Sequence, residues 1–399
     1  MIQRRGPRPL LLHLTLAMLR SSVSRATSLN WKHDWPNLNA ATIRQALTQH
    51  SADTAFPIAV WTEALRQDAA LIHGITAYRR HPWRRDIGDP PVVWSEGGSR
   101  LLDYGGTGPT VLFVPSLING FQVLDLMADH SMLRWLAANG TRPLLLDWGW
   151  PDATERGFTL TDYIAGRLER TMAEAARLTG GPIILAGYCM GGLLAVAAAQ
   201  RRPDLTHGLA LLATPWDFHA PTVERAREAA GCLALIEPAL ELLGAMPVDA
   251  LQMLFALLDP WGVADKYRAF AALPTDSPRA HRFVALEDWL NDGMPLAAPV
   301  ARECLSAWYG ANTPARGLWR VAGQIVDPSA LRLPVFVAIP QRDRIVPPDS
   351  ALALARLIPE ASTHSPAAGH VGMVAGAAAQ RQLWEPLLAW LLSQVHEGG

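Results

Sequence analysis

The stretch Gly187-Tyr188-Cys189-Met190-Gly191-Gly192 separates two apolar runs. The preceding run, 182–186, reads PIILA, and the following run, 193–199, reads LLAVAAA. This pattern predicts a strand, a sharp turn and a helix, which is the setting of a nucleophile elbow. Glycines two positions either side of the nucleophile let the strand and the helix approach closely. Cys189 stands at the nucleophile position; the alternative is a small buried cysteine in a tight turn.

Composition narrows the class of protein. Half of the 399 residues are apolar, which is enough for a sizeable core, and 35 basic residues balance 36 acidic ones. The near-zero net charge gives no indication of nucleic-acid binding. The three scattered cysteines fit neither a disulfide framework nor a metal cage. We therefore expect a cytoplasmic protein without a bound metal or cofactor.

The N-terminal region, residues 1–88, is predicted to be a helical segment, with apolar stripes over about 39–78. Residues 9–19 form an apolar run preceded by Arg4 and Arg5, as in a signal peptide. His13 interrupts that run, which favours a helix that docks on the protein or lies on an apolar surface. No uninterrupted run reaches the roughly 18 apolar residues of a membrane span.

Beyond residue 89, short apolar runs alternate with helix-length segments. Alternation of this kind indicates a mostly parallel sheet with helices on both faces. Between about 215 and 319 the strand signal disappears, and helical periodicity with many tryptophans takes over. We therefore predict an α/β-hydrolase core over 89–214 and 320–399, with a helical cap inserted at 215–319. The predicted strands lie at 92–94, 100–104, 111–114, 143–146, 182–186, 209–212 and 334–339.

In an α/β-hydrolase sheet the acid and the histidine follow the nucleophile in that order. Asp343 comes directly after the strand predicted at 334–339, and His370 precedes the last helix. His370 would accept the proton of Cys189, and Asp343 would hold the imidazole tautomer. Taken singly, Asp343 could instead cap a helix and His370 could be an ordinary loop histidine. The expected oxyanion donors are the backbone N–H groups of Met190 and Leu117.

Several further motifs resemble those of the polyhydroxyalkanoate synthases, over about residues 75–395. The likeness is greatest to the shorter synthases that work with a second, non-catalytic subunit. The matching segments, besides the elbow, are Pro115-Ser116-Leu117-Ile118-Asn119 with Asp125-Leu126, Asp147-Trp148-Gly149-Trp150-Pro151-Asp152 with Thr161-Asp162-Tyr163-Ile164, Thr214-Pro215-Trp216-Asp217-Phe218, Leu286-Glu287-Asp288-Trp289, Trp308-Tyr309, Gly323-Gln324-Ile325-Val326-Asp327 and Asp343-Arg344-Ile345-Val346-Pro347.

This resemblance implies an acyltransferase that polymerises (R)-3-hydroxyacyl-CoA into polyester, with release of CoA, through an acyl-cysteine on Cys189. It implies a growing polyester chain, a granule surface, and a homodimer or second synthase subunit as partners. Asp152 and Asn119 are candidates for assisting elongation or contacting substrate; Asp152 could equally be a turn-forming residue. One departure is Arg344, which stands where the family usually has a histidine after the acid.

Two other functions remain compatible with the same residues. A thioesterase, esterase or polyester depolymerase would use water in place of the hydroxyl acceptor, although most hydrolases of this fold use serine. A granule-associated, non-catalytic subunit would keep the fold with an idle site.

Overall fold

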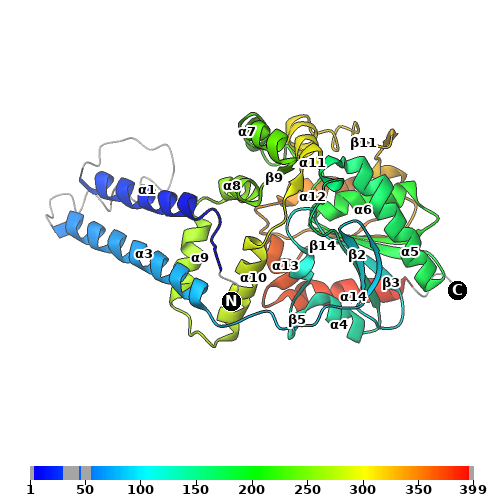
Figure 1. Ribbon diagram of the computed structural model, residues 1–399, viewed down its shortest axis with the longest axis horizontal. Coiled ribbons are helices and arrows are strands. Elements are labelled where there is room, and N and C mark those ends of the chain that lie inside the picture. Colours follow the sequence, from blue (N-terminus) through cyan, green and yellow to red (C-terminus); the bar gives the residue numbers. More distant parts are fainter. Residues whose placement is uncertain (1–3, 30–44, 46–54, 395–399) are drawn as a thin grey trace. The chain divides into compact units, whose positions relative to one another are not determined.

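The computed structural model describes residues 4–29, 45 and 55–394 (Figure 1). The chain forms two compact units, Met1–Arg84 with Phe255–Asn291, and Arg85–Leu254 with Asp292–Gly399. Residues 255–291, which the sequence assigned to a cap, therefore group with the N-terminal helices. Most of residues 39–54, where a helix was predicted, lie outside the described part of the chain.

The larger unit is built on an eight-stranded sheet with the order β1-β2-β6-β3-β7-β8-β13-β14. Strand β2 runs antiparallel to both of its neighbours, and the pairs from β6 to β14 are parallel. This order is that of the α/β-hydrolase fold, as predicted. The strands are β1 (Val92–Glu96), β2 (Ser99–Asp103), β3 (Thr110–Val114), β6 (Arg142–Asp147), β7 (Ile183–Tyr188), β8 (Thr206–Leu212), β13 (Val335–Ala338) and β14 (Ser362–His364).

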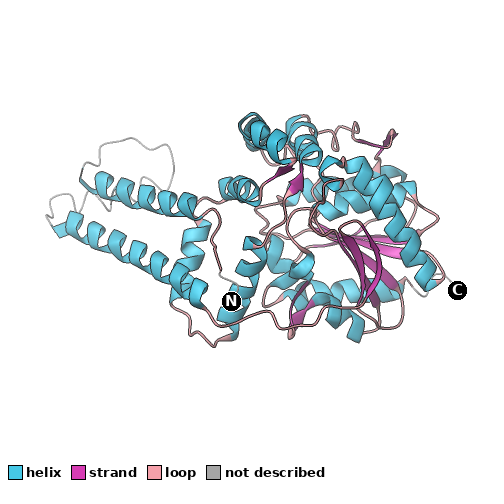
Figure 2. Ribbon diagram, viewed as in Figure 1, coloured by secondary structure: helices cyan, strands magenta, loops and turns pink. Residues whose placement is uncertain are grey.

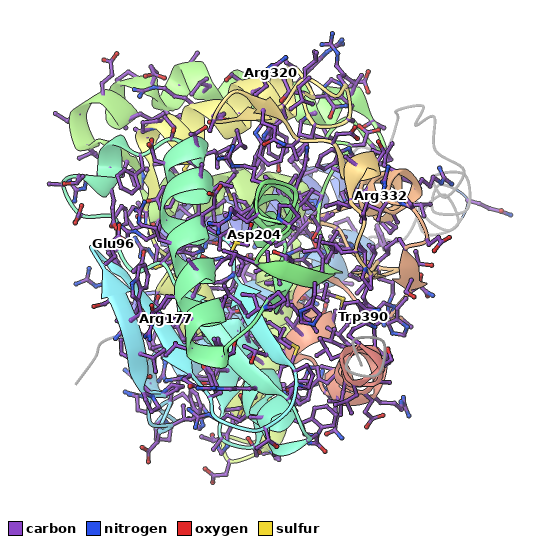
Figure 3. All side chains as sticks on the ribbon, turned by 90° about the vertical axis from the view of Figure 1, so that its right-hand side faces the viewer. Glu96, Arg177, Asp204, Arg320, Arg332 and Trp390 are labelled. Carbon is purple, nitrogen blue, oxygen red and sulfur yellow. The ribbon has the colours of Figure 1, made fainter. Side chains whose placement is uncertain are left out.

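Helices cover both faces of this sheet, with α5 and α6 on one face and α4 and α14 on the other (Figures 1 and 2). Successive side chains of each parallel strand point to opposite faces of the sheet, so both faces are apolar and both are covered by helices. Val335 and Val337 join the apolar cluster that includes α6. Phe336 contacts Trp390 of α14, with ring centroids 5.7 Å apart. Trp390 is labelled in Figure 3. The helices that surround the sheet are α4 (Met132–Ala138), α5 (Glu169–Thr179), α6 (Met190–Arg201), α12 (Pro348–Leu357), α13 (His370–Ala375) and α14 (Glu385–Ser393).

The insertion between β8 and β13 is mostly helical but not free of strands. Strands β9 and β10 pair antiparallel through Met246 and Leu296, which corrects the expectation that strands are missing from 215–319. Strands of two residues carry too little alternation to stand out in the sequence. The elements are α7 (Val223–Leu243), β9 (Ala245–Met246), α8 (Val248–Leu258), β10 (Leu296–Ala297), α11 (Ala298–Glu303) and the π-helix η4 (Cys304–Gly310).

Short elements complete the larger unit. Two further antiparallel pairs join β4 to β5 and β11 to β12. The π-helix η3 continues directly into α5, and η6 continues into α14. These elements are η1 (Phe121–Leu124), β4 (Asp125–Met127), β5 (His130–Ser131), η2 (Glu155–Gly157), η3 (Asp162–Leu168), β11 (Arg320–Val321), β12 (Gln324–Ile325), η5 (Pro328–Ala330) and η6 (Gln380–Trp384).

The smaller unit is helical. Helix α1 packs on α3, and the hydroxyl of Ser21 donates a hydrogen bond of 2.7 Å to Asp68. Helix α3 lies so close to α9 that a Cβ at Gly74 would be 2.0 Å from the carbonyl oxygen of Tyr267. No helix in the described part of the chain is long and apolar enough to cross a membrane. The helices are α1 (Leu10–Leu29), α3 (Ala55–Arg80), α9 (Gly262–Ala271) and α10 (Pro278–Asn291).

Candidate active site

Cys189 joins the end of β7 to the first turn of α6. Its backbone has φ 56° and ψ −126°, a conformation that a residue with a side chain adopts only under strain. The N–H of Cys189 donates to the carbonyl of Leu212 at 2.8 Å, and its own carbonyl accepts the N–H of Gly192 at 2.9 Å. These two bonds hold the turn, so the thiol stands at the helix N-terminus, where an anionic sulfur is favoured.

The glycines around Cys189 are needed for close packing. A Cβ at Gly187 would lie 2.4 Å from the Cα of Gly192, where strand and helix meet. A Cβ at Gly191 would lie 2.0 Å from the carbonyl oxygen of Val114. The same addition at Gly192 would meet the hydroxyl oxygen of Thr214 at 1.8 Å. The three glycines of the motif therefore reflect three separate close approaches, two to backbone atoms and one to the side chain of Thr214.

His370 and Asp343 meet at the same end of the sheet. Nδ1 of His370 lies 2.7 Å from Oδ2 of Asp343, and both side chains are buried. Oδ1 of Asp343 accepts the backbone N–H groups of Ile345 at 2.8 Å and Val346 at 2.9 Å. The loop after β13 thus fixes the carboxylate, and the carboxylate fixes one nitrogen of the imidazole.

The other side of His370 faces Cys189. Burial lowers the pKa of His370, but the charge of Cys189, the charge of Asp343 and hydrogen bonds with both raise it, to about 10 overall. Because Nδ1 is engaged by Asp343, Nε2 is the imidazole nitrogen left to interact with Cys189. The structure therefore brings Cys189, His370 and Asp343 together, with His370 between the other two, and this arrangement favours the protonated form of the imidazole.

Tyr188 is a neighbour of this site that the sequence did not single out. Its hydroxyl donates to the backbone carbonyl of His370 at 3.3 Å, and its ring lies 5.2 Å from the imidazole. Burial, followed by the charges of Cys189 and Asp343, raises the pKa of Tyr188, so its hydroxyl stays protonated as a donor. Its place inside the elbow motif, next to Cys189, was the available signal.

The loop after β3 holds Leu117, which was expected to be the second oxyanion donor. Gly191 packs directly on Val114 and Pro115, so this loop lies against the elbow. The N–H of Met190 is the first of α6 and has no partner within that helix. Leu117 is buried in the same loop. The two backbone groups thus belong to segments in contact, and their role as an oxyanion hole stays a prediction.

Asn119 and Asp152 lie in two different loops. Asn119 is buried and adopts a left-handed backbone, φ 65°, just before η1. Asp152 is exposed, and its Oδ1 accepts the N–H groups of Thr154 and Glu155, both at 2.8 Å. The contacts of Asp152 are those of the turn-forming alternative; a part in elongation stays a prediction for both residues.

Arg344 is exposed beside Asp343. The carboxylate of Asp343 contacts Ile345, Val346 and His370. Within residues 4–29, 45 and 55–394, no three His, Cys, Asp or Glu side chains are grouped to hold a metal ion.

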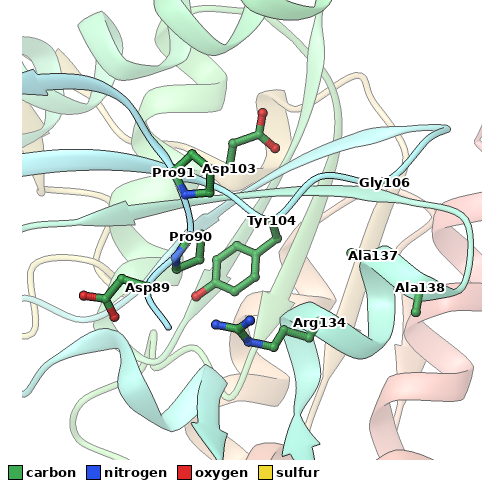
Figure 4. A pocket seen from close by; sticks show the side chains of 9 residues that line it. All are labelled: Asp89, Pro90, Pro91, Asp103, Tyr104, Gly106, Arg134, Ala137 and Ala138. Carbon is green, nitrogen blue, oxygen red and sulfur yellow. The ribbon is translucent and has the colours of Figure 1, made fainter. Parts of the chain in front are cut away.

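A pocket of about 520 Å³ lies away from these residues, beside Tyr104 and Arg134 (Figure 4). Its charged groups already have partners: Arg134 pairs with Asp125 at 2.9 Å, and Asp103 pairs with Arg142 at 2.6 Å. None of the predicted site residues lines it. The pocket is bounded by Asp89, Pro90, Pro91, Asp103, Tyr104, Gly106, Arg134, Ala137 and Ala138.

Fold and site together define an α/β-hydrolase-fold protein that carries cysteine at the nucleophile position. Comparison with known proteins narrows this class. The chain is 30% identical over 292 residues to a poly(3-hydroxyalkanoate) polymerase subunit PhaC from Synechocystis, covering 70% of this chain and 77% of the relative. It is 29% identical to the protein of that name from Allochromatium vinosum, covering 70% and 80%, and 28% identical to that from Thiocystis violacea, covering 77% and 89%.

The chain belongs to the poly(3-hydroxyalkanoate) polymerase family, whose members are acyltransferases. No family model matches the sequence. Among solved structures, an esterase from Thermogutta terrifontis is 20% identical, with a TM-score of 0.42, covering 77% of this chain and 98% of the esterase.

Proposed function

We propose that this protein polymerises (R)-3-hydroxyacyl-CoA into polyhydroxyalkanoate through an acyl-cysteine on Cys189. The observation that carries the proposal is His370 between Asp343 and Cys189 at a strained elbow. Membership of the polymerase family supports the substrate class. No cofactor is required, because the CoA thioester itself supplies the activated acyl group.

The first step forms the acyl-enzyme. The thiolate of Cys189 attacks the thioester carbonyl, and the backbone N–H groups of Met190 and Leu117 stabilise the oxyanion. The carbon–sulfur bond to CoA then breaks, and the CoA sulfur takes the proton of the His370 imidazolium. Exchanging one thioester for another changes the free energy little, so the acyl group stays activated.

The second step lengthens the chain. The hydroxyl of the next 3-hydroxyacyl group attacks the acyl-cysteine while neutral His370 accepts the hydroxyl proton. An ester bond forms, the bond to Cys189 breaks, and the thiolate–imidazolium pair is restored. Asp343 stays ionised throughout and keeps Nε2 directed at the reacting atoms.

The test is to incubate the purified protein with 3-hydroxybutyryl-CoA and with a medium-chain analogue, measuring free CoA and product together. We expect CoA release with polymer, a covalent acyl group on Cys189 by mass spectrometry, and loss of both in Cys189→Ala. Cys232→Ala, a cysteine substitution on α7, serves as the control and should retain activity. Undiminished CoA release by Cys189→Ala would contradict the mechanism, and free hydroxy acid in place of polymer would identify a thioesterase.

We also propose that the polyester granule binds helices α1 and α3. Exposed apolar side chains recur on one face of each helix, including Leu11 and Met18 on α1 and Ile58, Trp61 and Leu65 on α3. Spacings of three, four and seven residues place these side chains in a row, and an aliphatic polyester is an apolar surface on which such a row can lie.

This second proposal is tested by sedimentation with isolated granules. The change Trp61→Glu with Leu65→Glu should release the protein into the supernatant without abolishing CoA release from soluble substrate. Leu235→Glu, on the exposed side of α7, is the matched control and should still sediment. Unchanged sedimentation of the α3 variant would refute the proposal.

Because several relatives are named polymerase subunits, we further propose a second subunit, detectable as a rise in activity on addition of that subunit.

A further inference from the structure

The two loops that carry the acid and the histidine are joined to each other. The backbone N–H of Arg342 donates to the carbonyl of Ala368 at 2.9 Å, close to where Nδ1 of His370 lies 2.7 Å from Asp343. The nucleophile belongs to another part of the fold, because Cys189 follows β7, which pairs with β3 and β8 inside the sheet. Proton transfer at the sulfur requires a fixed spacing between these two parts.

Tyr188 connects the two parts. It is the last residue of β7, directly before Cys189, and its side chain is buried. Its hydroxyl donates to the backbone carbonyl of His370 at 3.3 Å, across 182 positions of the sequence. Its ring also lies beside the imidazole of His370, with centroids 5.2 Å apart and planes inclined by 34°. One side chain therefore contacts both the main chain and the ring of the histidine.

These two contacts restrain different motions of the histidine. The hydrogen bond fixes the start of α13, which begins at His370, relative to the end of β7. The ring contact limits the positions that the imidazole can take once its main chain is fixed. The groups that face this imidazole are then Asp343 at Nδ1, Cys189 from the elbow and the ring of Tyr188.

We propose that Tyr188 is a positioning residue that holds His370 at the spacing from Cys189 that proton transfer requires. The inference rests on the proposed function, in which His370 exchanges protons with groups that react at this sulfur. Misplacement of a catalytic group by about 1 Å can slow a reaction by about a hundredfold, so a hydrogen bond that fixes the histidine affects the rate. Tyr188 does not itself exchange a proton, because burial, followed by the charges of Cys189 and Asp343, raises its pKa.

The effect of Tyr188 can be measured on the histidine itself, without substrate. Tyr188→Phe removes the hydroxyl and retains the ring. When the imidazole is held less well against Cys189, the charge and the hydrogen bond of that cysteine raise the pKa of His370 less. Titration of nitrogen-15-labelled histidines by NMR should therefore show the His370 midpoint fall by about half to one pH unit in this variant.

The same substitution in Cys189→Ala completes a double-mutant cycle. With the sulfur gone, its spacing from the imidazole no longer matters, so adding Tyr188→Phe should leave the His370 midpoint unchanged. Equal shifts in both backgrounds would show that the hydroxyl acts on His370 independently of the sulfur. No shift in either background would show that the hydroxyl does not position the histidine. Either result would overturn the inference.

Tyr104→Phe is the matched control for loss of a tyrosine hydroxyl. The hydroxyl of Tyr104 donates to Asp125 at 3.1 Å, and Tyr104 lies beside the pocket of Figure 4, which none of the predicted site residues lines. Its His370 midpoint should equal that of the wild type, whatever its melting temperature. A shift shared by Tyr104→Phe and Tyr188→Phe would indicate general loosening of the fold and would contradict a positioning role.

Kinetics give a second readout. We expect Tyr188→Phe to form the acyl group on Cys189 about tenfold more slowly from 3-hydroxybutyryl-CoA, with little change in KM. A rise in KM at an unchanged rate would assign the hydroxyl to substrate binding and would also overturn the inference. Failure of the proposed function looks different, because the wild type would then neither release CoA nor form an acyl group, while the NMR cycle would still show whether Tyr188 holds His370.

Discussion

Asp343 uses its two carboxylate oxygens for different tasks, and only one of them reaches His370. Oδ2 lies 2.7 Å from Nδ1 of the imidazole, whereas Oδ1 accepts two backbone N–H groups, those of Ile345 and Val346. The loop therefore orients the acid before the acid orients the histidine. Substitution can separate these tasks, because an amide retains one oxygen acceptor and replaces the other oxygen with a donor.

The first prediction concerns Asp343→Asn. The amide oxygen can still accept from Ile345 and Val346, but the amide nitrogen then faces Nδ1 of His370 and favours the wrong tautomer. We expect CoA release from 3-hydroxybutyryl-CoA to fall by about 10⁴-fold, as for the acids of other triads. Thiol release measured at saturating substrate checks this.

Asp327→Asn provides the control for that substitution. Asp327 also accepts a loop N–H, that of Ser329 at 2.9 Å, but it lies outside the site. Its activity should stay within twofold of the wild type. If Asp343→Asn retained similar activity with an unchanged melting temperature, Asp343 would not be the acid of the triad.

The second prediction follows from the raised pKa of His370. Burial lowers this pKa, while the negative charges of Cys189 and Asp343 raise it to about 10, so the imidazole is protonated at neutral pH. Removing the sulfur in Cys189→Ala takes away two of the raising contributions, its charge and its hydrogen bond, so the pKa of His370 must fall. Titration of nitrogen-15-labelled histidines by NMR should show the His370 midpoint move down, with His207 as the unchanged internal reference.

The same shift sets the pH dependence of acylation. Below about pH 10 the imidazolium can give its proton to the departing CoA sulfur, and above that pH the donor is lost. We therefore expect the acylation rate to decline as pH rises through that value. A His370 midpoint that is the same in wild type and Cys189→Ala would contradict the ion-paired resting state.

Parts of this fold were predictable because they depend on local pattern. Buried parallel strands such as β3 and β7 read as short apolar runs, and the glycines beside Cys189 marked the turn between β7 and α6. The grouping of residues 255–291 with the N-terminal helices was not visible, since Asp288 meets Arg4 across 284 positions in the sequence. Order along the chain indicated Asp343 and His370, but the hydrogen bond of Tyr188 to the backbone of His370 joins residues 182 positions apart and could not be predicted from that order.

The third prediction tests the packing of the elbow. In Gly192→Ala the new Cβ would lie 1.8 Å from the Thr214 hydroxyl, so backbone or side chain must move. We expect the free energy of unfolding to fall by about 1–3 kcal/mol or more. Urea denaturation measures this loss. Gly181→Ala, where a Cβ meets nothing within 4 Å, should change the stability by less than about 0.5 kcal/mol.

The last prediction concerns a buried ion pair that supports the segment 147–152. Arg167 donates to Glu155 at 2.7 Å and to the hydroxyl of Ser99 at 2.7 Å, and both charged side chains are almost fully buried. Glu155 also accepts the N–H groups of Gly98 and Asp152. Removing one charge leaves the other unpaired, so Arg167→Ala should lower the free energy of unfolding by about 3–5 kcal/mol.

A second substitution distinguishes this electrostatic cause from simple loss of packing. When Arg167→Met is combined with Glu155→Leu, no buried charge is left alone, and the double variant should be more stable than Arg167→Met by itself. Arg177→Ala, which removes an exposed partner of Glu174, should cost less than about 1 kcal/mol. If the double variant were less stable than Arg167→Met, each substitution would add its own loss of stability. Loss of packing, and not the unpaired carboxylate, would then account for the effect.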